Sequence, residues 1–207
     1  RGVLADSASS ILMKVLYGAR MARFDLLRAV CALACCVTKW DPDCDRRLHR
    51  LMCYLYSTRH HRMVGYICQD DSPGDLESML YCDADFAGCS ETLRSTNGVH
   101  FDIAGPGSKF PITGVSKKQT AVSHSTPEAE IIAGAFGLRT ECLASAKRVD
   151  SLLGRERALL FKEDNQAMLR VAETGKNPTM RHLGRVHGCS VQWLHERYHD
   201  DFVRMDY

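Results

Sequence analysis

The period of the hydrophobic pattern changes once along this chain of 207 residues, at the polar segment Gln69–Asp75. Before this segment, apolar residues recur every three or four positions, as in Phe24–Ala34, which predicts amphipathic helices. After it, apolar and polar residues alternate, as in Val99–Ile103, which predicts strands. The polar segment itself contains a proline and a glycine, which interrupt regular structure. We therefore predict a helical domain over residues 1–75 and a second domain over residues 76–207.

Three helices are expected in the first domain. The stretches Ser7–Tyr17 and Phe24–Ala34 both carry apolar side chains at helical spacing. A third helix is expected after Asp41, because an aspartate is a good N-cap and Pro42 suits the first helical position. Its apolar stripe runs from Leu48 to Leu55 and predicts the buried face.

The second domain is expected to mix strands and helices. The patterns predict strands near residues 79–83, 99–103, 110–115, 158–161 and 202–207, and helices near residues 126–149, 164–173 and 190–197. Thr126 is the expected N-cap of the first of these helices, with Pro127 at its first position. This order of elements predicts an α/β fold, in which helices pack on the faces of a mixed sheet.

Three acidic residues lie where the predicted strands and helices begin or end. Asp83 ends the first strand, Glu130 lies in the first turn of a helix, and Asp164 follows an apolar strand. Strand ends and helix N-termini can converge on one rim of an α/β sheet. Carboxylates gathered there would repel one another unless divalent cations held them, and Mg²⁺ or Mn²⁺ prefers such ligands. Two such ions can activate a water and stabilise the leaving oxygen of a phosphodiester.

The same residues also have purely structural explanations. Asp83 can be a solvated strand end, Glu130 can complement a helix dipole, and Asp164 can be an N-cap. Spacing alone favours these explanations, because no spacing rule brings together residues that lie 47 and 34 positions apart.

Longer motifs around these acids change that balance. The blocks YCDADFAGCSETLRSTNGVHF, SKKQTAVSHSTPEAEIIAGA and FKEDNQAMLRVA resemble, in order, the ribonuclease H region of copia-type retrotransposon polyproteins. Upstream, ARFDLLRAVCALA and WDPDCDRRLHRLMCYLYST resemble the segment that connects reverse transcriptase to ribonuclease H in these polyproteins. The resemblance covers nearly the whole chain. It implies a ribonuclease H-like mixed sheet with flanking helices, preceded by a small helical segment.

The resemblance also implies an activity and its metal ligands. Asp83, Glu130 and Asp164 match the first three acidic positions and would bind two Mg²⁺ or Mn²⁺ ions. The reaction would be hydrolysis of the RNA strand of RNA/DNA hybrids during reverse transcription, beside the reverse transcriptase domain of the same polyprotein. Asp85 is the expected bystander. Glu130 is preferred to Glu128 because the apolar run Ile131–Ala133 follows it directly, as in the family block.

The fourth acidic position departs from the family pattern. The related block usually reads KHID, whereas this chain has RHLG at Arg181–Gly184, and glycine cannot ligate a metal. His187 lies nearby and is a candidate catalytic residue for product release or proton transfer. The structural alternative is that His182 and His187 are surface or capping residues. The departure also keeps open an inactive, retroelement-derived module that only binds nucleic acid, or a decayed fragment.

Positive charge is unevenly distributed, although the net charge is only +2. Residues 1–75 hold 11 Lys or Arg against 8 Asp, whereas the remainder holds 16 basic against 17 acidic residues. A basic helical face beside a nuclease site can follow phosphates, although a solvated helix face explains it equally well. In the second domain, the candidates for nucleic-acid contacts are Arg94, Ser95, Thr96, Asn97, Lys117, Lys118 and Gln119. The 2′-hydroxyl is the handle by which such residues tell RNA from DNA.

The cysteines help to predict the cellular compartment of the protein. None of the ten shows CxxC spacing, and most lie in apolar runs, so buried free thiols are expected rather than disulfides or a zinc site. With no secretory signal and no apolar run long enough to span a bilayer, we expect an intracellular protein, cytoplasmic or nuclear, with no membrane partner. Because the first residue is Arg1 rather than methionine, we also expect a segment of a larger product.

Overall fold

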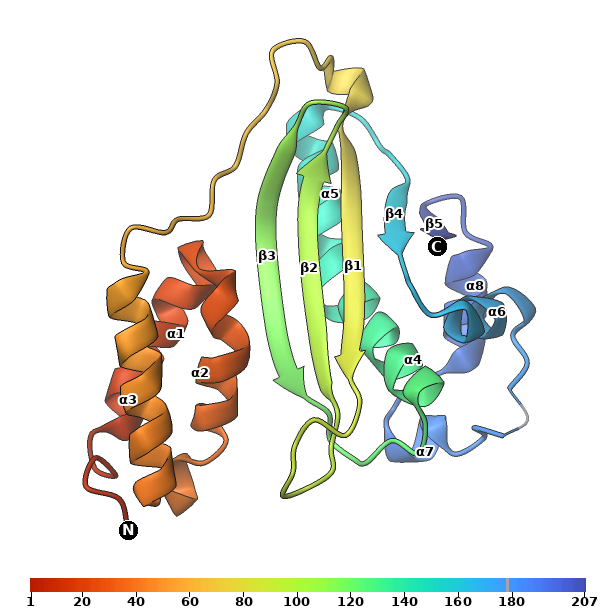
Figure 1. Cartoon of the computed structure of the whole chain (residues 1–207). Coiled ribbons are helices and arrows are strands. Elements are labelled where there is room, and N and C mark those ends of the chain that lie inside the picture. Colours follow the sequence, from red (N-terminus) through yellow and green to blue (C-terminus); the bar gives the residue numbers. More distant parts are fainter. Residues whose placement is uncertain (178) are drawn as a thin grey trace. The chain divides into compact units, whose positions relative to one another are not determined.

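The computed structural model describes residues 1–177 and 179–207 and shows two compact units (Figure 1). The first unit comprises Arg1–Val64 and Gly114–Lys117, and the second comprises Gly65–Thr113 and Lys118–Tyr207. The domain boundary at residue 75 stays a prediction. Within the described residues, no helix combines the length and the apolar character needed to cross a membrane.

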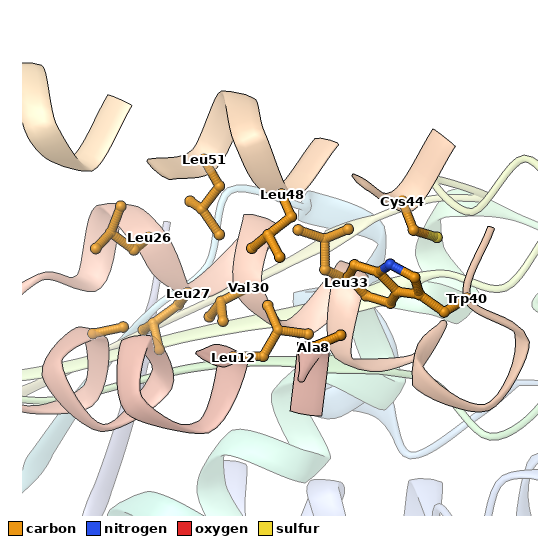
Figure 2. Close-up of a cluster of buried hydrophobic side chains, with 11 residues drawn as sticks. Ala8, Leu12, Leu26, Leu27, Val30, Leu33, Trp40, Cys44, Leu48 and Leu51 are labelled. Carbon is orange, nitrogen blue, oxygen red and sulfur yellow. The ribbon is translucent and has the colours of Figure 1, made fainter. Parts of the chain in front are cut away.

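The first unit is built from three helices, as the hydrophobic period predicts. These are α1 (Ala8–Ala22), α2 (Leu27–Ala34) and α3 (Pro42–Ser57), joined through short 3₁₀ turns. The expected N-cap of α3 is confirmed, because the Asp41 side chain accepts a hydrogen bond of 2.8 Å from the backbone N–H of Cys44. A buried apolar cluster holds the three helices together (Figure 2). Its members are Ala8, Leu12, Ala19, Leu26, Leu27, Val30, Leu33, Trp40, Cys44, Leu48 and Leu51.

Truncating one member of this cluster tests the packing of the first unit. Leu12 is fully buried, whereas the next residue, Met13, is 48% exposed. We expect Leu12→Ala to lower the free energy of unfolding by about 2–5 kcal/mol, because the lost apolar contacts leave a cavity. Met13→Ala is the matched control and should change it by no more than about 0.5 kcal/mol. Urea denaturation followed by circular dichroism measures both, and equal effects would contradict the assignment of the buried face.

A five-stranded mixed sheet forms the framework of the second unit, apart from Gly114–Lys117 of one edge strand, which are grouped with the first unit (Figure 1). Its strands are β1 (Glu77–Asp85), β2 (Thr96–Ala104), β3 (Lys109–Lys118), β4 (Leu159–Lys162) and β5 (Val203–Asp206). They lie in the order β3-β2-β1-β4-β5. β1 is antiparallel to β2 and parallel to β4, which is parallel to β5. The expected fold class is thus confirmed as an α/β mixed sheet with flanking helices, in a chain that begins with a small helical segment.

Helices flank this sheet. They are α4 (Thr126–Phe136), α5 (Leu143–Leu153), α6 (Gln166–Thr174), α7 (Leu183–Val186) and α8 (Val191–Tyr198). α4 packs on β1 and β2, and α6 packs on α8. A π-helical turn, Gly137–Cys142, connects α4 to α5, so the single helix expected over residues 126–149 is interrupted and extends four residues further.

Three local expectations are corrected. The N-cap of α4 is Ser125 rather than Thr126, because the Ser125 hydroxyl accepts a hydrogen bond from the backbone N–H of Glu128. Asp83 does not end β1 but lies two residues before its end, since pairing with β2 continues to Asp85. The cysteines are all free thiols, but only Cys44, Cys82, Cys142 and Cys189 are buried. Side chains in apolar runs are therefore not always buried, because one face of an amphipathic helix meets solvent.

Candidate acidic site

The topology of the second unit places Asp83 and Asp164 at one edge of the sheet. The parallel strands β1 and β4 are paired from Ser78 with Leu159 up to Tyr81 with Lys162. Asp83 and Asp164 each follow the last pair by two residues, and both are exposed. The sheet therefore brings together two acids that lie 81 positions apart in the sequence.

Glu130 approaches the same edge from the second turn of α4, rather than from the first turn in which it was expected. The helix is held on β1 through small residues, because Ala84 packs with Ala129 and Ala133. The Glu130 side chain is buried, and its Oε2 has no hydrogen-bond partner among the described residues. Burial, then the charges of Asp83 and Asp164, raise the pKa of Glu130 to about 7, while the backbone N–H of Ala84 opposes this shift. The three acids from separate sequence blocks thus lie close enough to interact electrostatically.

A fourth carboxylate, Glu163, was not among the predicted site residues. Its side chain is only 2% exposed. Its Oε1 accepts a hydrogen bond of 3.1 Å from the backbone N–H of Asn165, while its Oε2 has no partner among the described residues. Burial, then the charges of Glu130, Asp164 and Asp83, raise the pKa of Glu163 to about 8. We call Asp83, Glu130, Glu163 and Asp164 the acidic site.

The donor types of the acidic site fit a divalent cation. Carboxylate oxygens are the ligands that Mg²⁺ prefers, and the site holds two buried oxygens without partners. In residues 1–177 and 179–207, however, no three His, Cys, Asp or Glu side chains are arranged to hold an ion as they stand. Mutual repulsion opposes the gathering of carboxylates, and a cation would neutralise that repulsion. The residues therefore fit a divalent cation in type, and their side chains would have to close on the ion.

A second cluster surrounds the buried side chain of Glu128. Its Oε1 lies 3.0 Å from His182 Nε2 and 3.4 Å from His187 Nε2, and its Oε2 accepts a hydrogen bond of 3.1 Å from the backbone N–H of His124. The His187 side chain is 1% exposed, and its burial lowers the pKa of its imidazole. These contacts tie the first turn of α4 to the segment that carries Gly184. The role of His187 in product release or proton transfer stays a prediction. The carboxylate that lies beside its imidazole is that of Glu128.

Four of the predicted nucleic-acid contacts are buried. Gln119 Nε2 donates to Asn97 Oδ1 at 2.7 Å and to the carbonyl oxygen of Ala129 at 3.0 Å, and the Ser123 hydroxyl donates to Gln119 Oε1. These bonds link β2, the end of β3 and α4. In this conformation, four of the predicted side chains face inward and cannot contact ribose or phosphate directly. They are Ser95, Thr96, Asn97 and Gln119.

The three basic candidates differ in their surroundings. Arg94 is exposed in the segment between β1 and β2. Lys118 is half-buried, and its Nζ lies 3.1 Å from Cys89 Sγ. Hydrogen bonds from Thr92 and Lys118 lower the pKa of the Cys89 thiol to about 6. Lys117 is exposed and falls in the short segment grouped with the first unit.

Comparisons with known proteins add a structural likeness. No family model and no curated protein matches the sequence. Among solved structures, the chain is similar to a foamy viral protease-reverse transcriptase in complex with an RNA/DNA hybrid, with 15% sequence identity and a TM-score of 0.49. The match covers 98% of this chain and 24% of that chain. This chain thus spans about a quarter of that protein, and a likeness at this level does not assign a function.

Proposed function

We propose that this chain is a retrotransposon ribonuclease H of the copia type, which hydrolyses the RNA strand of RNA/DNA hybrids during reverse transcription. The observation that carries the proposal is that the pairing of β1 with β4 places Asp83 and Asp164 at one edge of the sheet, while Glu130 lies on the helix that packs on β1. Each acid comes from a different sequence block, and each block resembles the corresponding block of that family. If these acids only ended a strand or capped a helix, they would have no reason to lie at the same edge of the sheet.

Two Mg²⁺ or Mn²⁺ ions, when bound, would activate a water and stabilise the departing 3′ oxygen. The exposed carboxylates of Asp83 and Asp164 would hold them from the solvent side, and the buried Glu130 would hold them from the side of α4. Arg94, Lys117 and Lys118 would contact backbone phosphates. The hybrid would be presented by the reverse transcriptase domain of the same polyprotein, in the cytoplasm or nucleus.

A binding module without catalysis is the second candidate function. The observation that favours it is Gly184, which leaves no carboxylate at the fourth acidic position. Such a module would keep the fold and bind hybrid without cleaving it.

A cleavage assay on the full chain separates these functions. The substrates are an end-labelled RNA/DNA hybrid and, as matched controls, double-stranded RNA and double-stranded DNA of the same sequence. We expect Mg²⁺-dependent cleavage of the RNA strand of the hybrid alone, stopped by EDTA. Hybrid binding without cleavage at any Mg²⁺ or Mn²⁺ concentration would overturn the proposal in favour of the binding module. Absence of both would contradict both functions.

A further inference from the structure

Glu163 is a buried acid whose described surroundings leave one carboxyl oxygen without a partner. Removing a carboxylate from water is costly unless hydrogen bonds or an opposite charge compensate for it. Glu163 Oε1 has one backbone hydrogen bond, from Asn165, and Oε2 has none among the described residues. An apolar side chain of similar size would fill the same space at lower cost. The position of the acid therefore calls for a ligand.

The strand directs this side chain toward α4. Side chains alternate between the faces of a strand, so Glu163 shares a side with Leu159 and Phe161, which are both fully buried. The alternation extends past the end of β4, because the backbone N–H of Glu163 continues the ladder with a hydrogen bond of 3.0 Å to the carbonyl oxygen of Asp206. A methyl group built on Gly134 of α4 would lie 3.1 Å from the Phe161 ring. Glu163 thus lies on the side of the sheet from which α4 brings Glu130.

The charges around Glu163 are those of the other three acids. The carboxylates that act on it are Glu130, Asp164 and Asp83. Glu130 and Glu163 each hold one buried oxygen without a partner, Oε2 in both. Two unpaired buried carboxylate oxygens in one acidic site are the donors that a small, hard cation would satisfy.

We propose that Glu163 is a further carboxylate ligand of the acidic site and, with Glu130, holds a divalent cation at the buried end of that site. This inference rests on the cation requirement of the proposed function. It assigns to Glu163 the fourth carboxylate that Gly184 cannot supply. The ligand set then differs from the one that the sequence resemblance implies.

Cation binding, measured without any substrate, tests the inference. Mn²⁺ is titrated into the full chain and free Mn²⁺ is followed by electron paramagnetic resonance, with isothermal titration of Mg²⁺ as a second readout. We expect the wild type to bind Mn²⁺, and Glu163→Gln to weaken its tightest site at least tenfold, about 1.4 kcal/mol. Glu196→Gln is the matched control, since Glu196 is exposed on α8, and should bind as the wild type does.

Asp164→Asn separates the failure of this inference from that of the proposed function. If the wild type binds no Mn²⁺, or if Asp164→Asn binds it unchanged, the proposed cation site itself fails. If Asp164→Asn loses binding while Glu163→Gln keeps wild-type affinity, only the role of Glu163 is overturned. Glu163→Met covers the case in which Glu163→Gln does not fold, because an apolar side chain suits a buried site. Wild-type Mn²⁺ affinity in Glu163→Met overturns the inference equally.

Discussion

Replacing Asp164 by asparagine is expected to reduce Mg²⁺-dependent cleavage of the hybrid at least about a hundredfold. A bound cation supplies several kcal/mol of stabilisation to the charge that develops in the transition state, and each 1.36 kcal/mol corresponds to about a tenfold change in rate. Asparagine keeps the size of the side chain but removes the charge that holds the ion. Asp164 is exposed, so the substitution should leave the free energy of unfolding within about 0.5 kcal/mol of the wild type.

Asp85→Asn is the matched control for this change. Asp85 lies on the same face of β1 as Asp83 and is also exposed, so both variants remove one negative charge near the same edge of the sheet. Single-turnover rates on labelled hybrid should fall sharply for Asp164→Asn and change by less than about threefold for Asp85→Asn. Equal losses would mean that overall charge, rather than a specific ligand, supports the reaction, and would contradict the role of Asp164.

Much of the framework could be predicted from periodicity. Apolar residues at helical spacing identified α2 and α3, and alternation across Val99–Ile103 identified β2, because each pattern reports which face of an element meets the core. The N-cap of α4 was misplaced by one residue, since Ser125 and Thr126 are both good caps and only backbone geometry separates them. The strand containing Asp83 was cut short, because pairing with β2, rather than local pattern, sets its end.

The acidic site could be predicted only in part. Asp83, Glu130 and Asp164 were found through motif resemblance, and the parallel pairing of β1 with β4 explains why two of them meet. Glu163 was missed because a charged residue beside Asp164 looks like a solvated loop in the sequence. The alternation from Leu159 through Phe161 carried the signal that it faces inward. Asn97 and Gln119 were predicted to contact nucleic acid, because the sequence does not show that their side chains bond to one another. Only tertiary packing shows that bond.

The cluster around the buried Glu128 carboxylate leads to an expected change in stability comparable with that of Leu12→Ala. We expect Glu128→Ala to lower the free energy of unfolding by about 3 kcal/mol, because the substitution removes a buried carboxylate and leaves the groups that contact it uncompensated. The groups left behind are His182, His187 and the backbone N–H of His124. Glu196→Ala, at an exposed position of α8, should change it by no more than about 0.5 kcal/mol. Urea denaturation monitored by circular dichroism compares the two variants.

Cation binding by Glu128→Ala then separates the two glutamates near the start of α4, of which only Glu128 lies in the first turn. Glu128 contacts histidines, whereas Glu130, two residues later, interacts with Asp83 and Asp164. At a temperature where Glu128→Ala is still folded, its Mn²⁺ affinity should therefore match that of the wild type. A loss of stability below about 1 kcal/mol would contradict the structural role of Glu128. A tenfold loss of Mn²⁺ affinity in the folded variant would instead place Glu128 among the residues that hold the ion. The Glu128 carboxylate would then both stabilise the fold and bind the cation.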